Sequence, residues 1–138
     1  MPPDVPRLDA EMGALRLSAC DCQPQALSAR DDLLHPPSGW VHVTTYWTLT
    51  NGPLDIDLYP SARLVDDIGQ VWGDKLERPN DAIHIWPTSR WQPEEVVRAD
   101  YDVNLNPITP PGTYRLVIEV PGVAGQAVCG EVGVVSNE

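Results

Sequence analysis

The amino-acid sequence predicts an all-β domain, an antiparallel β-sandwich of immunoglobulin-like or jelly-roll-like type with about seven to nine strands. Apolar and polar residues alternate with a period of two in several short segments, as half-buried strands require. Residues typical of turns separate these segments at near-regular spacing, and no segment shows an extended helical period. A closed barrel fits the same pattern and is the alternative architecture.

The predicted strands follow in order along the chain. The first covers residues 13–19, and the strongest covers residues 40–50, where Trp47 lies on the predicted core face and Trp40 and Tyr46 lie on the other. Asp66–Gly69 is typical of a hairpin turn, and Gly is available there for a positive φ. Further strands are predicted over residues 54–58, 62–65, 71–72, 82–86, 96–105, 113–120 and 127–135. The predicted core includes Leu15, Leu17, Val41, Val43, Trp47, Leu49, Leu64, Tyr101, Val103, Leu116 and Ile118.

The chain is predicted to hold one domain over residues 13–138, preceded by a flexible, proline-rich linker over residues 1–12. The net charge of −11 comes from 9 basic and 20 acidic residues. Such a field repels phosphate backbones and anionic lipid, so we expect no nucleic-acid partner and no binding to a membrane surface. No apolar run is long enough to cross a membrane.

Three stretches of the chain carry short motifs in a fixed order: VHVTTYWTLT, ARLVDDIGQVWGDKLERP and TSRWQPEEVVRADYDVNLNPITPPGTYRLVIEV. The motif positions are Trp47, Leu64, Val65, Asp66, Gly69, Asp74, Pro79, Trp91, Pro93, Glu95, Asp100, Tyr101, Pro107, Pro110, Pro111, Gly112, Tyr114 and Leu116. Over about residues 40–120, this set resembles the extracytoplasmic β-sandwich domain at the C-terminal end of many bacterial membrane glycosyltransferase-like proteins, which also occurs as a free-standing unit. The sequence departs from that pattern at Glu94, where the family has Gly, and in the spacing of residues 75–79.

The resemblance implies a non-catalytic accessory domain on the outer face of a bacterial membrane, or secreted, that is tethered to a membrane protein. Its implied partner is a glycan or another component of the cell envelope. The alternative is a structural or protein–protein interaction domain without a small-molecule ligand.

Catalytic signatures are missing from the sequence. It contains no metalloprotease, α/β-hydrolase or phosphate-loop motif, and His35, His42 and His84 have no metal-ligand spacing. We therefore expect no catalytic residues and no enzyme activity.

Aromatic residues are the main candidates for a binding role, because exposed planar rings stack on the faces of sugars. The candidate carbohydrate-binding residues are Trp40, Tyr46, Trp72, Trp86 and Trp91. Packing in the core or at a sheet edge is the alternative role for each ring. Tyr114, after the Pro110–Gly112 turn, is expected to offer its hydroxyl group to that turn.

Acidic residues in the predicted turns are candidates for a structural calcium ion, which takes carboxylate and carbonyl oxygens. Asp66 and Asp67 lead this set, which also includes Asp55, Asp57 and Asp74. Solvated surface charge is the alternative explanation for these residues.

Three cysteines exclude a fully paired set of disulfides within one chain. In an oxidising compartment, Cys129 is predicted to pair with Cys20 or Cys22, which would tie the first strand region to the last. The alternative, a zinc site, is poorly supported, because a C-x-C pair with a third cysteine and no nearby histidine lacks the usual ligand spacing.

Overall fold

The computed structural model describes residues 7–29, 39–50, 54, 57–75, 87–92, 95–123 and 125–135. The predicted all-β class is confirmed, since these residues form strands and a single short 3-10 helix, η1 (Thr88–Arg90). The candidate Trp86 and the strand predicted over residues 82–86 lie outside the described residues. The strands are β1 (Arg7–Met12), β2 (Leu15–Gln23), β3 (Ala26–Ser28), β4 (Trp40–Leu49), β5 (Ser61–Val65), β6 (Val71–Lys75), β7 (Val97–Leu105), β8 (Gly112–Glu119) and β9 (Gln126–Val135).

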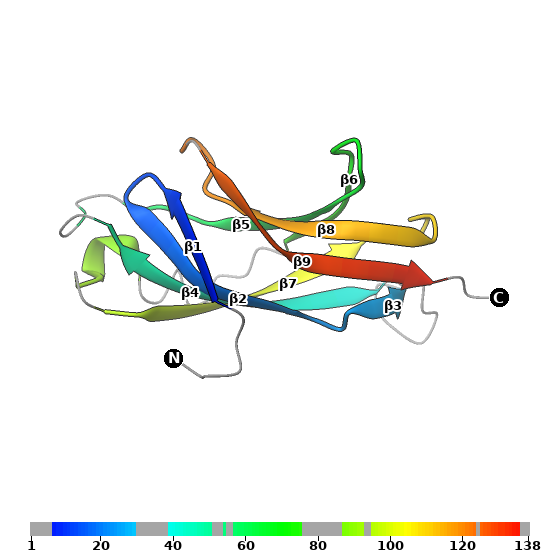
Figure 1. Cartoon of the computed structure of the whole chain (residues 1–138), viewed down its shortest axis with the longest axis horizontal. Helices are drawn as coiled ribbons and strands as arrows, with labels where there is room; N and C mark the ends of the chain where they lie inside the picture. The colour runs from blue at the N-terminus through cyan, green and yellow to red at the C-terminus, as the bar shows by residue number, and fades with distance from the viewer. Residues whose placement is uncertain are drawn as a thin grey trace.

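All nine described strands belong to one sheet, in the order β1-β2-β4-β7-β6-β5-β8-β9-β3. Neighbouring strands are antiparallel except β3 and β9, which are parallel. The sheet curls on itself, so that β2, β4 and β7 lie across the core from β5, β8 and β9 (Figure 1). The structure therefore shows one curled, mixed sheet, and the predicted arrangement of two separate antiparallel sheets is not established.

Strand β6 is the reason that the sheet is continuous, because it pairs with β5 on one side and with β7 on the other. Gly73 makes this close approach possible. A Cβ atom at Gly73 would lie 3.2 Å from Leu64 Cβ and 3.2 Å from Val103 Cγ1, which is tighter than ordinary van der Waals contact. The absent side chain lets β6 lie over the core side chains of both neighbouring strands.

The predicted core is confirmed, since all of its members are buried. Trp47 is fully buried and still has a partner for its polar group, because its indole N–H donates to Thr45 Oγ1 at 2.8 Å. The Thr45 hydroxyl in turn donates to the backbone oxygen of Ala99 on β7 at 2.7 Å. This chain of hydrogen bonds removes the cost of burying two polar side chains between β4 and β7.

Residues 7–12 were expected to be linker, but they form β1, which pairs with β2. The segment RLDAEM alternates as a strand does: Leu8, Ala10 and Met12 are the more buried residues, and Met12 is fully buried. The prolines that suggest a linker lie before this segment, at positions 2, 3 and 6. The correction places the start of the folded sheet at least six residues earlier than the sequence predicted.

The turn before β8 is held by Tyr114. As expected, its hydroxyl donates a hydrogen bond, here to the backbone oxygen of Pro110, at 2.5 Å. The ring is buried and contacts the core. Burial raises the pKa of Tyr114, and the negative charge of Asp66 raises it to a smaller extent. The hydroxyl therefore stays protonated and able to donate.

Of the two cysteine pairings that the sequence left open, the structure contains Cys20–Cys129, with a Cα–Cα distance of 5.5 Å. This disulfide joins β2 to β9, which lie in opposite halves of the curled sheet. Cys129 is the extra residue in a β-bulge, because Leu116 faces Gly130 while Val117 faces Val128. Cys22 is free and buried.

Candidate functional site

The four candidate rings that the structure describes have different surroundings. Trp91 is 1% exposed and belongs to the core cluster, and Tyr46 is 5% exposed, so neither presents an open ring face to a sugar. The expectation that these two residues take part in stacking is therefore not supported. Trp40 and Trp72 are half-buried, and Trp72 also packs against the core cluster.

Trp72 is held in place by the hairpin that joins β5 to β6. Its indole N–H donates to Asp66 Oδ2 at 3.0 Å. The other carboxylate oxygen of Asp66, Oδ1, accepts hydrogen bonds from the backbone N–H groups of Ile68 at 3.1 Å and Gln70 at 2.8 Å. The hydrogen bond from Trp72 is the largest cause that lowers the pKa of the Asp66 carboxyl below its ordinary value, and the backbone N–H donors lower it further. Asp66 thus fixes both the turn and the orientation of the ring.

These hydrogen bonds also bear on the predicted calcium site. Both carboxylate oxygens of Asp66 already accept hydrogen bonds from N–H donors, which a cation would have to displace. Asp67 is exposed in the same turn. Among the residues that the structure describes, no three His, Cys, Asp or Glu side chains gather closely enough to hold a metal ion. The Asp66 carboxylate is thus already engaged by N–H donors, Asp55 lies outside the described residues, and calcium binding at Asp66 and Asp67 stays a prediction.

Trp72 borders an open groove of about 470 Å³ between β6 and the end of β7. Its polar wall consists of Asp74, Asn104 and Asn106. A backbone hydrogen bond joins the two sides of the groove: the N–H of Asn106 donates to the backbone oxygen of Trp72 at 2.7 Å. The Asn106 side-chain oxygen accepts from the backbone N–H of Ile108 at 3.1 Å, which fixes the orientation of that amide. We call this feature the Trp72 groove.

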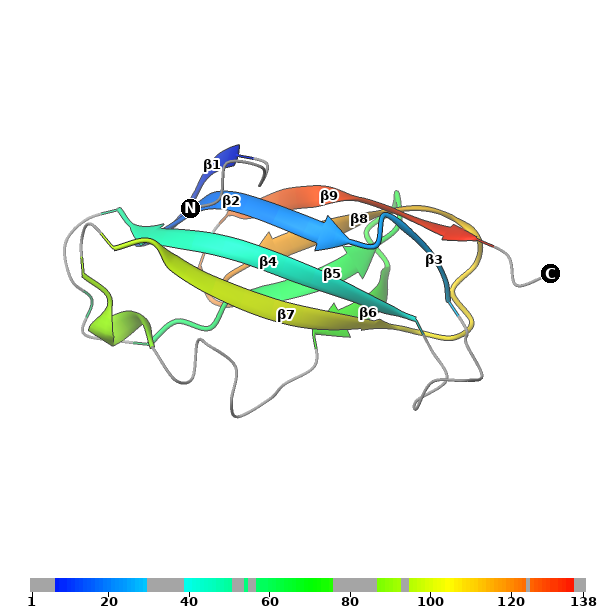
Figure 2. The ribbon, with the colours of Figure 1, turned by 90° about the horizontal axis from the view of Figure 1, so that it is seen from below.

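Trp40 lies on the same outer surface as the groove. It faces Asn104 directly across the β4–β7 pair, and Asn104 faces Asp74 directly across the β7–β6 pair. Side chains of directly opposed residues point to the same face of a sheet, so these three residues form one row across three strands. Figure 2 shows β4 beside β7, with β6 beyond. Because neighbouring strands in a sheet are spaced at roughly 5 Å, the backbone positions of Trp40 and Asp74, two strands apart, are separated by about 10 Å.

The next polar group along this surface is built around His42, which is half-exposed. Its Nδ1 atom lies 2.9 Å from Asp102 Oδ1, and its Nε2 atom lies 3.4 Å from Asp100 Oδ1. The Arg98 Nε–H donates to the Asp100 carboxylate at 3.2 Å. The side chains of His42, Asp100 and Asp102 all lie at the surface, where they can accept or donate hydrogen bonds to a polyhydroxylated ligand.

Together, the Trp72 groove and the polar surface beside it present two partly exposed indole rings with carboxylate and amide groups between them. Such a set can stack on an apolar ring face and bind hydroxyl groups at its edges. The sequence singled out Trp40 and Trp72 as candidate rings. It did not identify Asn104, Asn106 or Asp102 as site residues, because their role depends on which strands are neighbours.

None of the protein-family models, curated proteins or solved structures compared with the chain matches it. Within the described residues, no helix is long and apolar enough to cross a membrane.

Proposed function

We propose that this domain is a non-catalytic, extracytoplasmic accessory module that binds a glycan weakly at the Trp72 groove. The single observation that supports the proposal most strongly is the fixed indole of Trp72. Because Asp66 holds the indole N–H at 3.0 Å, the ring loses little conformational freedom when a sugar stacks on it. Asp74 and Asn106 stand beside the ring as hydrogen-bonding partners for hydroxyl groups.

The extracytoplasmic location in this proposal has two supports, the resemblance to glycosyltransferase-associated domains and the Cys20–Cys129 disulfide. Disulfides persist mainly in oxidising compartments. The same resemblance suggests that the two halves of the curled sheet correspond to the two layers of an immunoglobulin-like sandwich, joined here through β6.

The net charge favours a neutral sugar over an acidic one at this site. The Trp72 groove contains Asp74, and Asp100 and Asp102 lie on the neighbouring surface, so an anionic glycan would be repelled. Stacking on one or two rings corresponds to dissociation constants from about micromolar to millimolar.

A glycan array followed by calorimetry tests the proposal. We expect a neutral oligosaccharide to bind, and we expect Trp72→Ala to weaken the binding by about tenfold or more. Tyr59→Ala is the matched control, because Tyr59 is an exposed aromatic residue that does not line the groove. If no glycan binds, or if Trp72→Ala binds as well as the parent, the glycan proposal is wrong.

A further inference from the structure

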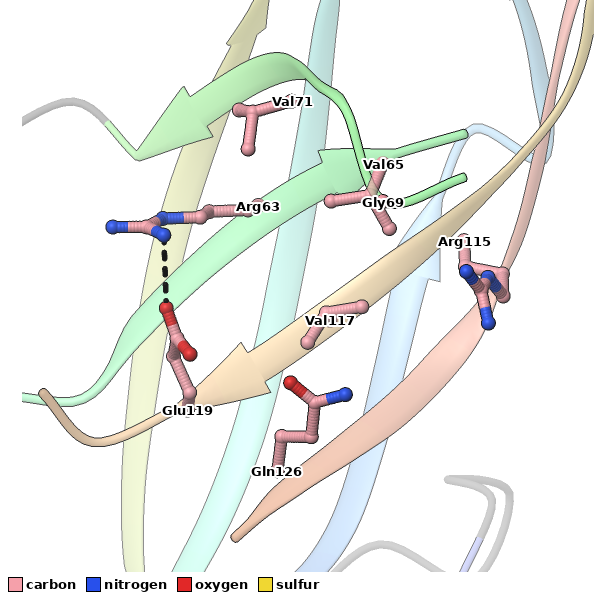
Figure 3. Close-up of a pocket in the computed structure, with 8 residues that line it drawn as sticks. All are labelled: Arg63, Val65, Gly69, Val71, Arg115, Val117, Glu119 and Gln126. Atoms are coloured by element: carbon pink, nitrogen blue, oxygen red, sulfur yellow. Dashed lines mark ion pairs between the residues drawn. The ribbon is translucent and has the colours of Figure 1, made fainter. Parts of the chain in front are cut away.

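A second surface site lies on the outer face of β5 and β8, next to β9 and the β5–β6 turn. It is a shallow cavity of about 180 Å³. Figure 3 shows its residues, which include two arginines from neighbouring strands and an apolar floor. We call it the arginine dish; its lining residues are Arg63, Val65, Gly69, Val71, Arg115, Val117, Glu119 and Gln126.

We propose that the arginine dish binds a partner protein through one acidic side chain flanked by apolar side chains. This interaction goes beyond the glycan site and does not depend on it, although Val71 borders both the dish and the Trp72 groove.

Strand pairing gives the dish its alternation of charge and apolar surface. Arg63 on β5 faces Val117 on β8, and Val65 on β5 faces Arg115 on β8. Each arginine therefore has a valine directly opposite, and the two guanidinium groups lie on a diagonal with the valines between them. Val65 and Val117 are buried by their neighbours, while Val71 at the rim is 43% exposed.

The two arginines differ in how their charge is balanced. Arg63 Nη1 lies 3.1 Å from Glu119 Oε1, so this guanidinium already has an ion pair (Figure 3). Arg115 donates through Nη2 to the backbone oxygen of Asp66 at 3.1 Å. Within the described part of the chain, Arg115 has no carboxylate partner. Since Arg63 already has Glu119 as its ion-pair partner, Arg115 is the group that would receive an incoming carboxylate.

Size and chemistry identify the occupant. The dish is smaller than the roughly 300–1,000 Å³ of pockets that enclose small molecules, so its volume suits one side chain of a larger partner. No aromatic residue lines it, which disfavours a stacked sugar. Val71 and, on β9 beside Val117, Val128 are each 43% exposed and extend the apolar surface around the arginines. A glutamate or aspartate between apolar residues complements this arrangement.

Nuclear magnetic resonance titration of the disulfide-bonded, full 138-residue chain tests the proposal. The probe is the blocked peptide acetyl-Val-Glu-Val-amide, and the comparison peptide has Gln in place of Glu. We expect the Glu peptide to shift the backbone signals of Val65, Val117 and Gln126 in a saturable way at millimolar concentration. The Gln peptide is expected to bind about tenfold more weakly, because it lacks the charge-assisted hydrogen bond.

Two variants make the test specific. Arg115→Gln should reduce binding of the Glu peptide to the level of the Gln peptide, whereas Arg98→Gln, which removes an arginine from the other half of the sheet, should leave it unchanged. Equal binding of the two peptides, unchanged binding to Arg115→Gln, or no saturable shift would each overturn the proposal. The peptides contain no sugar and the glycan array contains no acidic peptide, so failure here and failure of the glycan proposal are distinguishable.

Discussion

The Sγ atom of Cys22 occupies space that a side chain at Gly130 would need. A Cβ atom built on Gly130 would lie 3.0 Å from this sulfur, which is closer than ordinary contact allows. Gly130 directly follows Cys129 in the bulge of β9, so the buried thiol and the disulfide share one small region between β2 and β9.

Gly130→Ala is therefore expected to lower the free energy of unfolding by about 1–3 kcal/mol, the usual cost of overpacking a core. Urea denaturation with the disulfide intact measures the effect. Gly133→Ala is the matched control on the same strand, because its nearest contacts would lie at 3.7 and 3.9 Å, and we expect a change within about 0.5 kcal/mol. In a Cys22→Ala background the cost of Gly130→Ala should largely disappear; an undiminished cost there would contradict the steric explanation.

Reduction of the Cys20–Cys129 disulfide is expected to destabilise the domain strongly. The two cysteines are 109 residues apart, and closing a loop of about 100 residues contributes on the order of 4.7 kcal/mol in the chain-entropy model. Burial raises the pKa of the Cys22 thiol, which slows its exchange with the disulfide near neutral pH. Unfolding midpoints with and without a reductant measure the effect. The double variant Cys20→Ala/Cys129→Ala should be insensitive to the reductant, and equal midpoints for the oxidised and reduced parent would refute the expectation.

Local alternation was enough to predict many of the core residues, because the side-chain period of a strand depends only on neighbours in sequence. Val41, Val43 and Trp47 are examples, and all three are fully buried, but the same alternation assigned the buried Tyr46 to the outer face. Strand pairing was not predictable in the same way. The joining of β6 to β7 and the parallel pair β3–β9 depend on contacts between segments far apart in the chain.

The candidate site shows the same limit. Trp72 follows the β5–β6 turn and Trp91 follows η1, yet the first borders a groove and the second is buried. A position near a turn does not tell which way a ring will pack. Trp40, Asn104 and Asp74 form one row only because β4, β7 and β6 are neighbours, which no local pattern contains.

Tyr114→Phe removes the hydroxyl that closes the turn before β8 and keeps the buried ring. The backbone oxygen of Pro110 then loses its partner, and we expect the free energy of unfolding to fall by about 0.5–1.5 kcal/mol. Thermal and urea unfolding measure this change. Tyr114→Ala should cost more, about 3–5 kcal/mol, because it also leaves a cavity. A Phe variant as stable as the parent would mean that the hydroxyl has no net role in the turn.

The hydrogen bond from Trp72 to Asp66 is expected to lose its contribution to stability at acidic pH. Because the Trp72 donor and the backbone donors lower the folded-state pKa of Asp66, the ionised carboxylate stabilises the fold at pH values above the unfolded pKa of about 3.9. This contribution is lost as the pH falls through the lower, folded-state pKa. Trp72→Phe removes the donor, so we expect its melting temperature to lie below that of the parent at pH 6, with a difference that shrinks below about pH 4.

Melting temperatures between about pH 2 and pH 6 measure this difference, and any loss of ring packing in Trp72→Phe contributes a constant offset that does not depend on pH. Asp66→Asn should show the same convergence with the parent, since it lacks the titrating group. Asp67→Asn is the matched control, because it removes a carboxylate from the same turn while leaving the Trp72 hydrogen bond in place. A difference between Trp72→Phe and the parent that stays constant over the whole range would show that the indole N–H does not stabilise the ionised Asp66.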